Sequence, residues 1–301
     1  MDRFLNNFPI QRIIPEDLVF PEQLKNISES PKELFFRGKL PRQNDKLFAI
    51  VGTRLCSDYG KEIAFSIAKD LSQAGLTIAS GMALGVDTFS HKGALEASGP
   101  QGSAEFCPTV AVLGTGLDEA SIYPQENLKL ARQILEKGGC LISEYPEGTK
   151  GANFTFPQRN RIIAAISLGV LVVEAKIKSG ALITADFAKK YKKKIFAVPG
   201  NIHSQNSKGC HWLIKQGAKL AENASDILQE LNLPELKSKQ KTFETKEQQL
   251  IFNALEQGAL HIDKIIEKSQ LPPQVISGII SIMEMENKIK NLGANVYAIN
   301  R

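Results

Sequence analysis

The sequence LFAIVGTR, residues 47–54, is the clearest indication of how this chain folds. It begins with an apolar run and ends in glycine, threonine and arginine. The sequence LTIASGMALGVD, residues 76–87, repeats this plan after a helix-like stretch. Apolar runs without polar alternation are typical of strands that are buried on both faces of a parallel sheet. Each run that ends in glycine therefore predicts a strand followed by a tight turn into a helix.

The same plan recurs along the chain as far as residue 221. The predicted strands are Leu47–Val51, Leu76–Ser80, Val110–Leu113, Cys140–Ser143, Val170–Glu174, Ile195–Val198 and Ala218–Ala221. The predicted helices between them are Lys61–Ala74, Thr88–Ala97, Gln125–Lys137, Gln158–Leu168, Ala181–Lys190 and Cys210–Gln216. This regular alternation predicts an α/β fold with a doubly wound, mostly parallel sheet, which we place in residues 46–231.

Residues 1–45 differ from this pattern because their prolines exclude a long helix. The prolines are Pro9, Pro15, Pro21, Pro31 and Pro41. We predict an extended N-terminal arm, with a short helix near Glu22–Ile27 and an edge strand at Leu34–Phe36.

The last 70 residues contain a linker and a small second domain. Residues 232–246 are polar and rich in lysine, which predicts a linker. Residues 247–301 then show three helical patterns and a hairpin around Gly293, which is the winged-helix plan. The elements are Glu247–Glu256, Ile262–Ser269, Pro272–Asn287, Lys288–Asn291 and Val296–Asn300. The third helix carries almost no positive charge, so a protein-contact or weak accessory role is favoured over reading of the major groove.

The overall composition excludes few functions. A net charge of +5 permits a polyanionic partner without requiring one. Its cysteines, Cys56, Cys107, Cys140 and Cys210, form no C-x-x-C pair, so neither a zinc cluster nor a redox motif is predicted. Reduced thiols, the lack of a membrane-spanning apolar run and the lack of an apolar signal core predict a cytoplasmic protein without membrane contact.

Glycine, hydroxyl and basic residues follow several of the predicted strands. Ligands of a doubly wound sheet bind beyond the carboxyl ends of its strands, so we expect these residues to meet at one edge. Backbone N–H groups at glycines and helix N-termini attract anions, and cationic side chains neutralise phosphate oxygens. The predicted phosphate-binding residues are Gly52, Thr53, Arg54, Ser80, Gly81, Met82, Ala83, Gly114, Thr115, Lys178, Ser179 and Gly180.

The segment FTFPQRNR, residues 154–161, sets aromatic side chains beside two arginines at a predicted helix start. Single-stranded nucleic acid is bound by backbone neutralisation together with base stacking on aromatic faces. Phe156 is therefore a candidate stacking residue, and Arg159 and Arg161 are candidate phosphate ligands. In the alternative interpretation, the phenylalanines belong to the core and the arginines cap the helix or pair locally.

Two nucleotide-binding motifs are missing. The dinucleotide pattern G-x-G-x-x-G does not follow the first strand, and the pattern G-x-x-x-x-G-K-[ST] occurs nowhere in the chain. NAD-dependent chemistry and ATP hydrolysis are therefore disfavoured, and no cofactor or metal is predicted.

Taken together, these motifs make the chain resemble the DprA/Smf family of bacterial DNA-processing proteins. The resemblance covers roughly residues 21–231, and its motifs occur in the family's order. They are residues 52–54 and 80–87, AVLGTGLD (111–118), Tyr123-Pro124, Ser143-Glu144, FPQRNRII (156–163), VEAKIKSGALITA (173–185), FAVPG (196–200) and GCHWLIKQGAKL (209–220).

The resemblance implies an extended Rossmann-like fold that binds single-stranded DNA, protects incoming DNA and dimerises without catalysing a reaction. It also implies help in loading the recombinase RecA during natural transformation. Lys150 and Asn160 join the implied DNA-binding residues, and Trp212, Ile214 and Leu220 fall in the segment that resembles the dimer region. The C-terminal segment resembles the winged-helix domain of many members. The sterile-alpha-motif-like domain of some members is not expected, because only a short arm precedes the match.

Two departures from the family reduce the expected positive charge near the DNA. Leu84 stands where many members carry a basic residue. Asn153 stands at another such position, shortly before the Phe-Pro pair. Either DNA binding is weaker in this chain, or Lys150 and Lys178 substitute.

An enzyme is the main rival interpretation. The fold resembles that of cytokinin-activating phosphoribohydrolases, which cleave nucleotide N-glycosidic bonds and carry P-G-G-x-G-T-x-x-E. The comparable stretch here is Pro199-Gly200-Asn201-Ile202, which lacks the second glycine and the glutamate. A third interpretation makes the winged helix a regulator that binds duplex DNA.

Other polar groups have simpler structural interpretations. Asp87 and His91 share a helix face and form an acid–base pair or half a metal site, or else a helix cap and a packed histidine. Glu144 and Glu174 are either catalytic carboxylates or acceptors for loop N–H groups. The lysines of residues 189–194 attract DNA or form a solvated helix end. For each, the structural interpretation is favoured.

Overall fold

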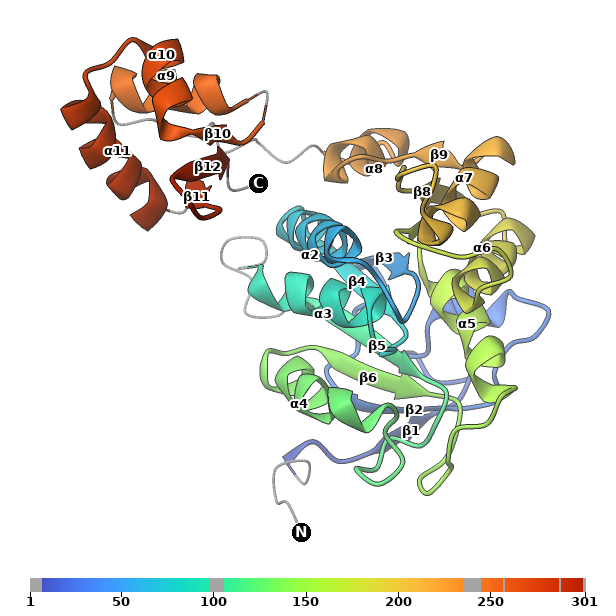
Figure 1. Ribbon diagram of the computed structural model, residues 1–301. Coiled ribbons are helices and arrows are strands. Elements are labelled where there is room, and N and C mark those ends of the chain that lie inside the picture. The colour runs from blue at the N-terminus through green and yellow to red at the C-terminus, as the bar shows by residue number, and fades with distance from the viewer. Residues whose placement is uncertain (1–6, 98–105, 235–244, 257, 287, 300–301) are drawn as a thin grey trace. The chain divides into compact units, whose positions relative to one another are not determined.

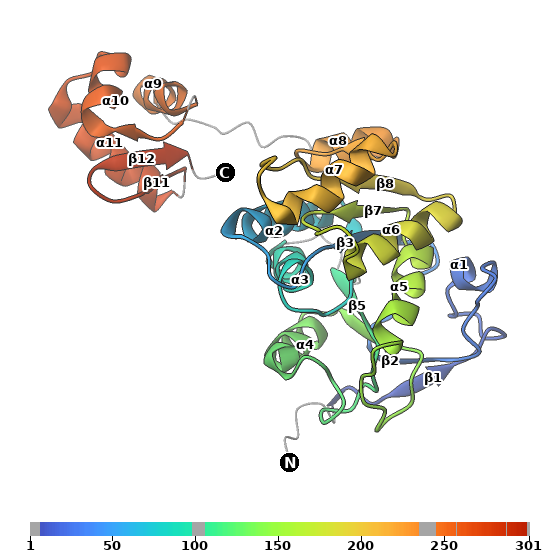
Figure 2. The ribbon, with the colours of Figure 1, turned by 45° about the vertical axis from the view of Figure 1, so that its right-hand side comes forward.

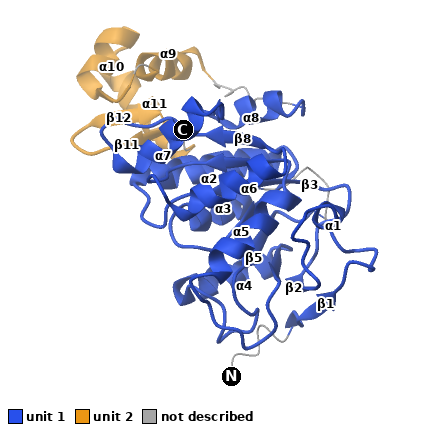
Figure 3. Cartoon of the chain, turned by 90° about the vertical axis from the view of Figure 1, so that its right-hand side faces the viewer, with its two compact units in different colours: residues 1–236 blue, residues 237–301 orange. Residues whose placement is uncertain are grey.

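The apolar runs of the larger part of the chain pair into one sheet (Figure 1). The structure, a computed structural model, describes residues 7–97, 106–234, 245–256, 258–286 and 288–299. Contacts divide the chain into two units, Met1–Leu236 and Lys237–Arg301 (Figure 3). Most of the predicted linker, residues 235–244, lies outside the described residues.

The sheet of the first unit has the order β1-β2-β6-β5-β4-β3-β7-β8-β9. Strands β3 to β9 are parallel to one another, whereas β2 is antiparallel to β6 and β1 is antiparallel to β2. The doubly wound, mostly parallel sheet is therefore confirmed. The strands are β1 (Gln11–Ile13), β2 (Leu34–Gly38), β3 (Lys46–Val51), β4 (Leu76–Ser80), β5 (Thr109–Leu113), β6 (Cys140–Ser143), β7 (Gly169–Val172), β8 (Lys194–Ala197) and β9 (Lys219–Leu220).

Helices cover both faces of this sheet (Figure 2). Helices α1, α5, α6 and α7 pack on one face, and α2, α3, α4 and α8 pack on the other. Alternate residues of β3 enter the two cores, since Ala49 joins the first and Ile50 the second. Burial on both faces explains why the strands read as apolar runs. The helices are α1 (Glu22–Lys25), α2 (Asp58–Gln73), α3 (Val86–Glu96), α4 (Leu128–Glu136), α5 (Thr155–Ile166), α6 (Gly180–Lys190), α7 (Lys208–Lys215) and α8 (Ala224–Glu230).

The strand order reverses at β3. Strands β4, β5 and β6 lie on one side of β3, and β7, β8 and β9 lie on the other. In open α/β sheets, ligands bind in the crevice outside the carboxyl ends of the strands at such a switch point. The loops that leave β3 and β7 are therefore the place to seek a site.

The N-terminal segment extends this sheet. β2 pairs with β6 through Phe35↔Ser143, and β1 covers the other side of β2 through Arg12↔Phe35. A strand forms at the predicted Leu34–Phe36, as part of β2, but its assignment as the edge strand is wrong because β1 forms the edge. Helix α8 was missed although a capping box precedes it, in which Asn223 Oδ1 accepts from the N–H of Asp226 and the Asp226 carboxylate accepts from the N–H of Asn223.

The second unit contains three helices and a three-stranded antiparallel sheet in the described residues. Its apolar core includes Ile251, Ile265, Ile276 and Ile280. This is the predicted winged-helix plan with one added short strand. Its elements are α9 (Lys246–Leu255), β10 (Leu260–His261), α10 (Ile262–Ser269), α11 (Pro273–Met285), β11 (Ile289–Asn291) and β12 (Val296–Ile299). Among the helices that the structure describes in either unit, none has the length and apolarity that a membrane span needs.

Candidate nucleic-acid interface

An open hollow of about 490 Å³ lies at the switch point of the sheet, between the loops that follow β3 and β7 and the start of α5. It brings together segments that lie far apart in the sequence. The predicted DNA-binding residues that line it are Gly52, Thr53, Arg54, Ala83, Phe156, Arg159, Asn160, Ser179 and Gly180. Leu55, Asp87, Tyr123, Asn153 and Lys176 line it as well.

The N-terminus of α6 opens into this hollow. Ser179 is the N-cap residue, but its side chain makes no capping hydrogen bond. Its Oγ is buried and has no hydrogen-bond partner among the described residues. A Cβ atom at Gly180 would meet nothing within 4 Å, so the space in front of the first turn is open. Free backbone N–H groups and the partial positive charge of an eleven-residue helix suit an anion at this point.

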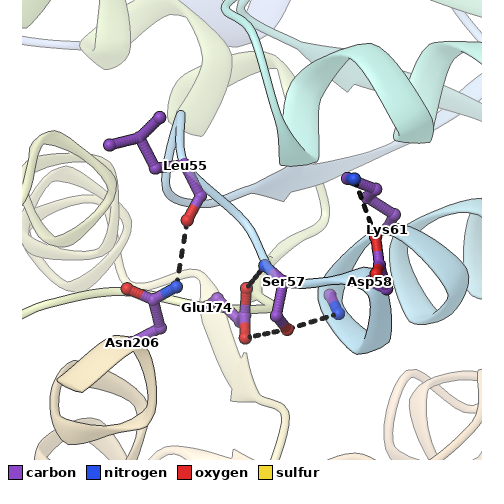
Figure 4. Close-up of polar contacts among 7 residues, drawn as sticks. Leu55, Ser57, Asp58, Lys61, Glu174 and Asn206 are labelled. Atoms are coloured by element: carbon purple, nitrogen blue, oxygen red, sulfur yellow. Dashed lines mark hydrogen bonds and ion pairs between the residues drawn. The ribbon is translucent and has the colours of Figure 1, made fainter. Parts of the chain in front are cut away.

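The loop after β3 presents Arg54 to the same hollow. The carboxylate of Glu174 accepts the backbone N–H of Ser57 at 2.8 Å and the Ser57 hydroxyl at 2.7 Å (Figure 4). The Glu174 carbonyl accepts the N–H of Thr53 at 2.7 Å. On the other side, Asn206 Nδ2 donates to the Leu55 carbonyl at 3.0 Å. The backbone on both sides of Arg54 is thus tethered.

The Arg54 side chain itself is exposed and forms no ion pair within the described part of the chain. Its Cζ lies 5.7 Å from the centroid of the Phe156 ring. The Tyr123 ring lies on Phe156 with centroids 5.5 Å apart and an interplanar angle of 43°. An available guanidinium beside two aromatic rings is the combination that binds single-stranded nucleic acid.

Gly114 lies against Phe156, and neither Gly114 nor Thr115 lines the hollow. A Cβ atom at Gly114 would lie 3.0 Å from Cδ1 of Phe156, and one at Gly151 would lie 2.5 Å from Cζ. Thr115 is fully buried, and its hydroxyl donates to the Gly116 carbonyl at 3.1 Å. Gly114 and Gly151 thus leave room for the aromatic ring, and Thr115 is too buried for the phosphate contact that was expected of it.

The backbone N–H groups of Gly81 and Ala83, in the loop after β4, form hydrogen bonds within the protein. The N–H groups of Gly81 and Ala83 donate to Oδ2 of Asp87 at 3.1 and 3.2 Å. The Ser80 hydroxyl donates to the Ile50 carbonyl at 2.6 Å, and Met82 is fully buried. Burial raises the pKa of Asp87 against the opposing charge of Arg159. The loop shapes one wall of the hollow, and its Gly81 and Ala83 amides are bonded within the protein.

The two arginines of α5 are held inside the fold. The guanidinium of Arg159 donates to the carbonyls of Gly81 and Val112. Burial lowers the pKa of Arg159 to about 10, so the group stays charged at neutral pH. Arg161 is 3% exposed and ion-pairs with Oε1 of Glu144 at 2.6 Å. The expectation of free phosphate ligands is thus replaced by internal pairing, although Arg159 still contributes positive charge to the wall of the hollow.

Asn160 Nδ2 donates to the Gly180 carbonyl at 3.2 Å and so joins α5 to α6. Lys150 and Lys178 are exposed and lie outside the lining, whereas Lys176 lies within it. Of the two departures noted in the sequence, Asn153 lines the hollow and Leu84 does not.

Tyr123 and Lys176 were missed as site residues. Both fall in motifs that the sequence analysis quoted, yet nothing local distinguishes them from their neighbours. The long loop that follows β5 brings Tyr123 over Phe156, and the loop after β7 turns Lys176 into the hollow. Their only sequence signal is that they follow strands whose carboxyl ends meet.

His91 lies in the core beneath this region. Its Nδ1 lies 2.7 Å from the Thr109 hydroxyl, and burial lowers its pKa to about 3. Within the described ranges, no cluster of three His, Cys, Asp or Glu side chains is suited to a metal ion.

The residues predicted for the dimer interface lie away from the hollow. Trp212 and Leu220 are 43% and 48% exposed, and Ile214 is half-buried. A dimer through this surface stays a prediction.

Comparison with known proteins places both units. The sequence profile of DNA recombination-mediator protein A matches residues 11–232, and that of the DprA winged helix domain matches residues 235–295. Protein Smf of Escherichia coli K12 is 41% identical over 224 residues, which is 74% of this chain but 57% of that protein. DNA processing protein DprA of Streptococcus pneumoniae is 38% identical over 230 residues, or 76% of this chain and 77% of that protein.

Two solved structures resemble the chain in fold as well as sequence. DNA processing protein A from Streptococcus pneumoniae superposes with a TM-score of 0.66 at 37% identity and covers 76% of either chain. DNA processing protein A from Helicobacter pylori superposes with a TM-score of 0.63 at 27% identity, over 75% of this chain and 96% of that one. The latter structure is described as revealing a unique single-stranded DNA binding mode.

Proposed function

This chain belongs to the DNA recombination-mediator protein A family. We propose that it binds single-stranded DNA in the hollow at the switch point of its first unit. The matched profile, the relatives named for DNA processing and the Helicobacter pylori structure support this proposal. The match spans only 57% of the length of the Escherichia coli relative, so any activity of that full-length protein is only proposed for this chain.

One observation carries the proposal. The hollow joins three kinds of group that a single strand needs: a tethered, exposed guanidinium, a pair of aromatic rings and an open helix N-terminus. Arg54 would neutralise one phosphate, and Ser179 and Gly180 would bind another through O–H and N–H donors. Tyr123 would offer its exposed ring to a base. Groups of this kind recognise the backbone and the base faces, so little sequence preference is expected.

The test is fluorescence anisotropy with unrelated single-stranded and duplex oligonucleotides at two salt concentrations. Arg54→Ala should weaken single-strand binding for every sequence and lower the log–log salt slope by about 0.7, the value for one phosphate contact on a single strand. Arg12→Ala is the matched control, because Arg12 is an exposed arginine on β1, far from β3 in the strand order. Equal affinities for Arg54→Ala and Arg12→Ala would overturn the assignment of the site.

We propose in addition that the protein is not an enzyme. The stretch that would carry a phosphoribohydrolase motif is used for internal hydrogen bonds. The Pro199 carbonyl accepts the Tyr59 hydroxyl at 2.9 Å, and the Gly200 carbonyl lies 3.1 Å from Nε2 of His211. Incubation with AMP should release no adenine, whereas robust release would contradict the proposal.

We propose that the protein acts in the cytoplasm by protecting incoming DNA and by loading RecA on it during natural transformation. The family's name as a recombination mediator supports this role. The test is RecA filament formation on single strands that are already covered by single-stranded DNA-binding protein. The chain should shorten the lag of filament formation, and Arg54→Ala should not. An unchanged lag with the unsubstituted chain would contradict a mediator role.

We propose that two copies associate through the surface of α7 and β9. Exposed Trp212 and Leu220 are large apolar side chains of the kind that is enriched in interface cores. Sedimentation should show a dimer that Trp212→Ala with Leu220→Glu converts to a monomer. Exposed Leu84→Glu is the control. A monomer for the unsubstituted chain would exclude this interface.

A further inference from the structure

A second hollow lies at the opposite ends of the helices that form the first one. Its volume is about 450 Å³. It lies between the turn from α6 to β8 on one side and α1, with the segment that follows α1, on the other. Its lining includes Gln23 of α1, Ala165 of α5 and the consecutive residues Lys190, Tyr191, Lys192 and Lys193. The first turns of α5 and α6 line the first hollow, whereas Ala165 and Lys190, in the last turns of the same helices, line the second. Helices α1, α5 and α6 lie on the same face of the sheet (Figure 2).

Only some of the lysines at this turn form ion pairs within the protein. Lys194 ion-pairs with Glu230, and Lys190 lies 2.8 Å from Oε1 of Glu29. Lys192 and Lys193 form no ion pair with any residue that the structure describes. Lys193 is half-buried, and burial lowers its pKa. An unpaired, partly desolvated ammonium in the wall of a hollow gains from an anion placed there.

Lys192 also stands where the backbone favours glycine. Its φ is +56°, and the turn around it closes α6 through the N–H of Lys193, which donates to the Ala188 carbonyl at 2.8 Å. Such a left-handed residue after a helix is usually glycine, because a side chain there costs on the order of 1 kcal/mol. A lysine at this strained position is accounted for if its side chain contacts a ligand.

Aromatic rings adjoin these cations. Phe187 and Tyr191 stack with centroids 6.0 Å apart and planes inclined by 23°. Lys190 Nζ lies 6.0 Å from each ring centroid. The Tyr191 hydroxyl is buried and lacks a hydrogen-bond partner in the described part of the chain. Glu29 is the opposing charge, but its pair with Lys190 is exposed on both sides and contributes little, so a phosphate can compete for the lysine.

We propose that this hollow is a second contact for the backbone of single-stranded DNA, in which Lys192, Lys193 and the released Lys190 hold phosphate. The inference rests on the function proposed above. From Gly180 to Lys190, α6 rises about 15 Å at about 1.5 Å per residue. A strand with a phosphate every 3.4 Å, the spacing in a duplex, needs about five nucleotides to reach from one site to the other. One strand of moderate length would thus engage both hollows.

The experiment compares a trinucleotide of thymidine with a 20-nucleotide strand. The two phosphodiesters of the trinucleotide are adjacent and cannot occupy both hollows. The variant is Lys192→Gly with Lys193→Gln, because glycine suits the left-handed position and preserves the fold. The control, Lys69→Gln with Lys129→Gln, removes the same charge from α2 and α4 on the other face. Thermal unfolding verifies that each variant is folded.

We expect the variant to bind the 20-nucleotide strand about tenfold more weakly at low salt, with a salt slope lower by about 1.4, twice the value for one contact. It should bind the trinucleotide as the unsubstituted chain does. Arg54→Ala should weaken binding of both lengths. If Arg54→Ala weakens binding and the lysine variant behaves as its control, the second site is overturned while the proposed function stands. If the unsubstituted chain binds neither length, both are overturned.

Discussion

Replacing Glu174 with glutamine tests how the Arg54 loop is held above the sheet. Glu174 is 4% exposed, and its carboxylate accepts two hydrogen bonds from Ser57, which is also the N-cap of α2. The substitution keeps the shape of the side chain. It also leaves the bond from Thr53 to the Glu174 carbonyl, because that bond belongs to the backbone. The perturbation is therefore confined to the two side-chain bonds (Figure 4).

The expected loss follows from the kind of bond that is removed. A hydrogen bond to a charged group contributes about 1.5–3 kcal/mol, and a neutral one about 0.5–1.5 kcal/mol. Glutamine offers one neutral oxygen, which can accept from only one of the two Ser57 donors with the original geometry. Its NH₂ group then faces either the other Ser57 donor or a lone pair of the Ser57 hydroxyl. With partial compensation from relief of a buried charge, Glu174→Gln should lower the free energy of unfolding by about 1–2 kcal/mol. In a unit of this size each kcal/mol lowers the melting temperature by about 2–4 °C.

The loosened loop should also weaken DNA binding. The bonds of Thr53 and Leu55 remain, so at most the equivalent of one residue of the loop must be ordered again when DNA binds, and fixing the backbone of one residue costs about 1–2 kcal/mol. The expected fall in single-strand affinity is therefore about tenfold, measured by anisotropy at a temperature where the variant is fully folded.

The control is Glu62→Gln, which removes the same charge from an exposed position on the same helix, α2. Equal melting temperatures for the two variants would refute the assigned strength of the tether. A destabilised Glu174→Gln that binds DNA normally would refute the claim that the tether positions Arg54.

Three further outcomes are expected. Gly180→Asp places a carboxylate in the open space at the start of α6, so it should stabilise the helix slightly yet weaken single-strand binding on the order of tenfold, whereas Gly180→Ala should bind normally; equal binding by both would remove phosphate from this helix end. His91 should remain neutral at pH 5 in an NMR titration, because its folded pKa of about 3 lies below its unfolded value, and a titration midpoint near 6.5 would contradict its burial. Between these two pKa values only the unfolded chain binds the proton, so His91 lowers the free energy of unfolding by up to about 1.4 kcal/mol per pH unit as the pH falls from about 6.5 to about 3. Ile280→Ala should lower the stability of the second unit by about 2–5 kcal/mol and speed hydrogen exchange in α9 but not in β4; equal acceleration in β4 would contradict the division into two units.

The sequence predicted the strands, and the helices between them, wherever a strand is buried on both faces of the sheet. The run at residues 47–51 became β3 because alternate residues of a buried parallel strand face two apolar cores, which leaves no polar position in the pattern. The boundaries shifted where capping chemistry decides them. Ser57 caps α2 and starts it at Asp58, before the predicted start at Lys61. The pairing of β1 with β2 was missed, because short strands that pair at an edge carry a weak pattern.

The family, the doubly wound sheet and the edge where the glycine-rich loops meet all followed from the order of residues in the chain. Which residues of that edge are free to face a ligand depends on contacts that form when the chain folds. Arg54 and Arg159 look alike as sequence, yet Arg54 is exposed while Arg159 bonds to carbonyls that lie 47 and 78 residues away in the chain. Tyr123 became a site residue because a loop carries its ring over Phe156. The reason is that a charged or aromatic side chain is either paired inside the protein or left available to a ligand, depending on which groups the fold places beside it. Those groups are not its neighbours in the chain.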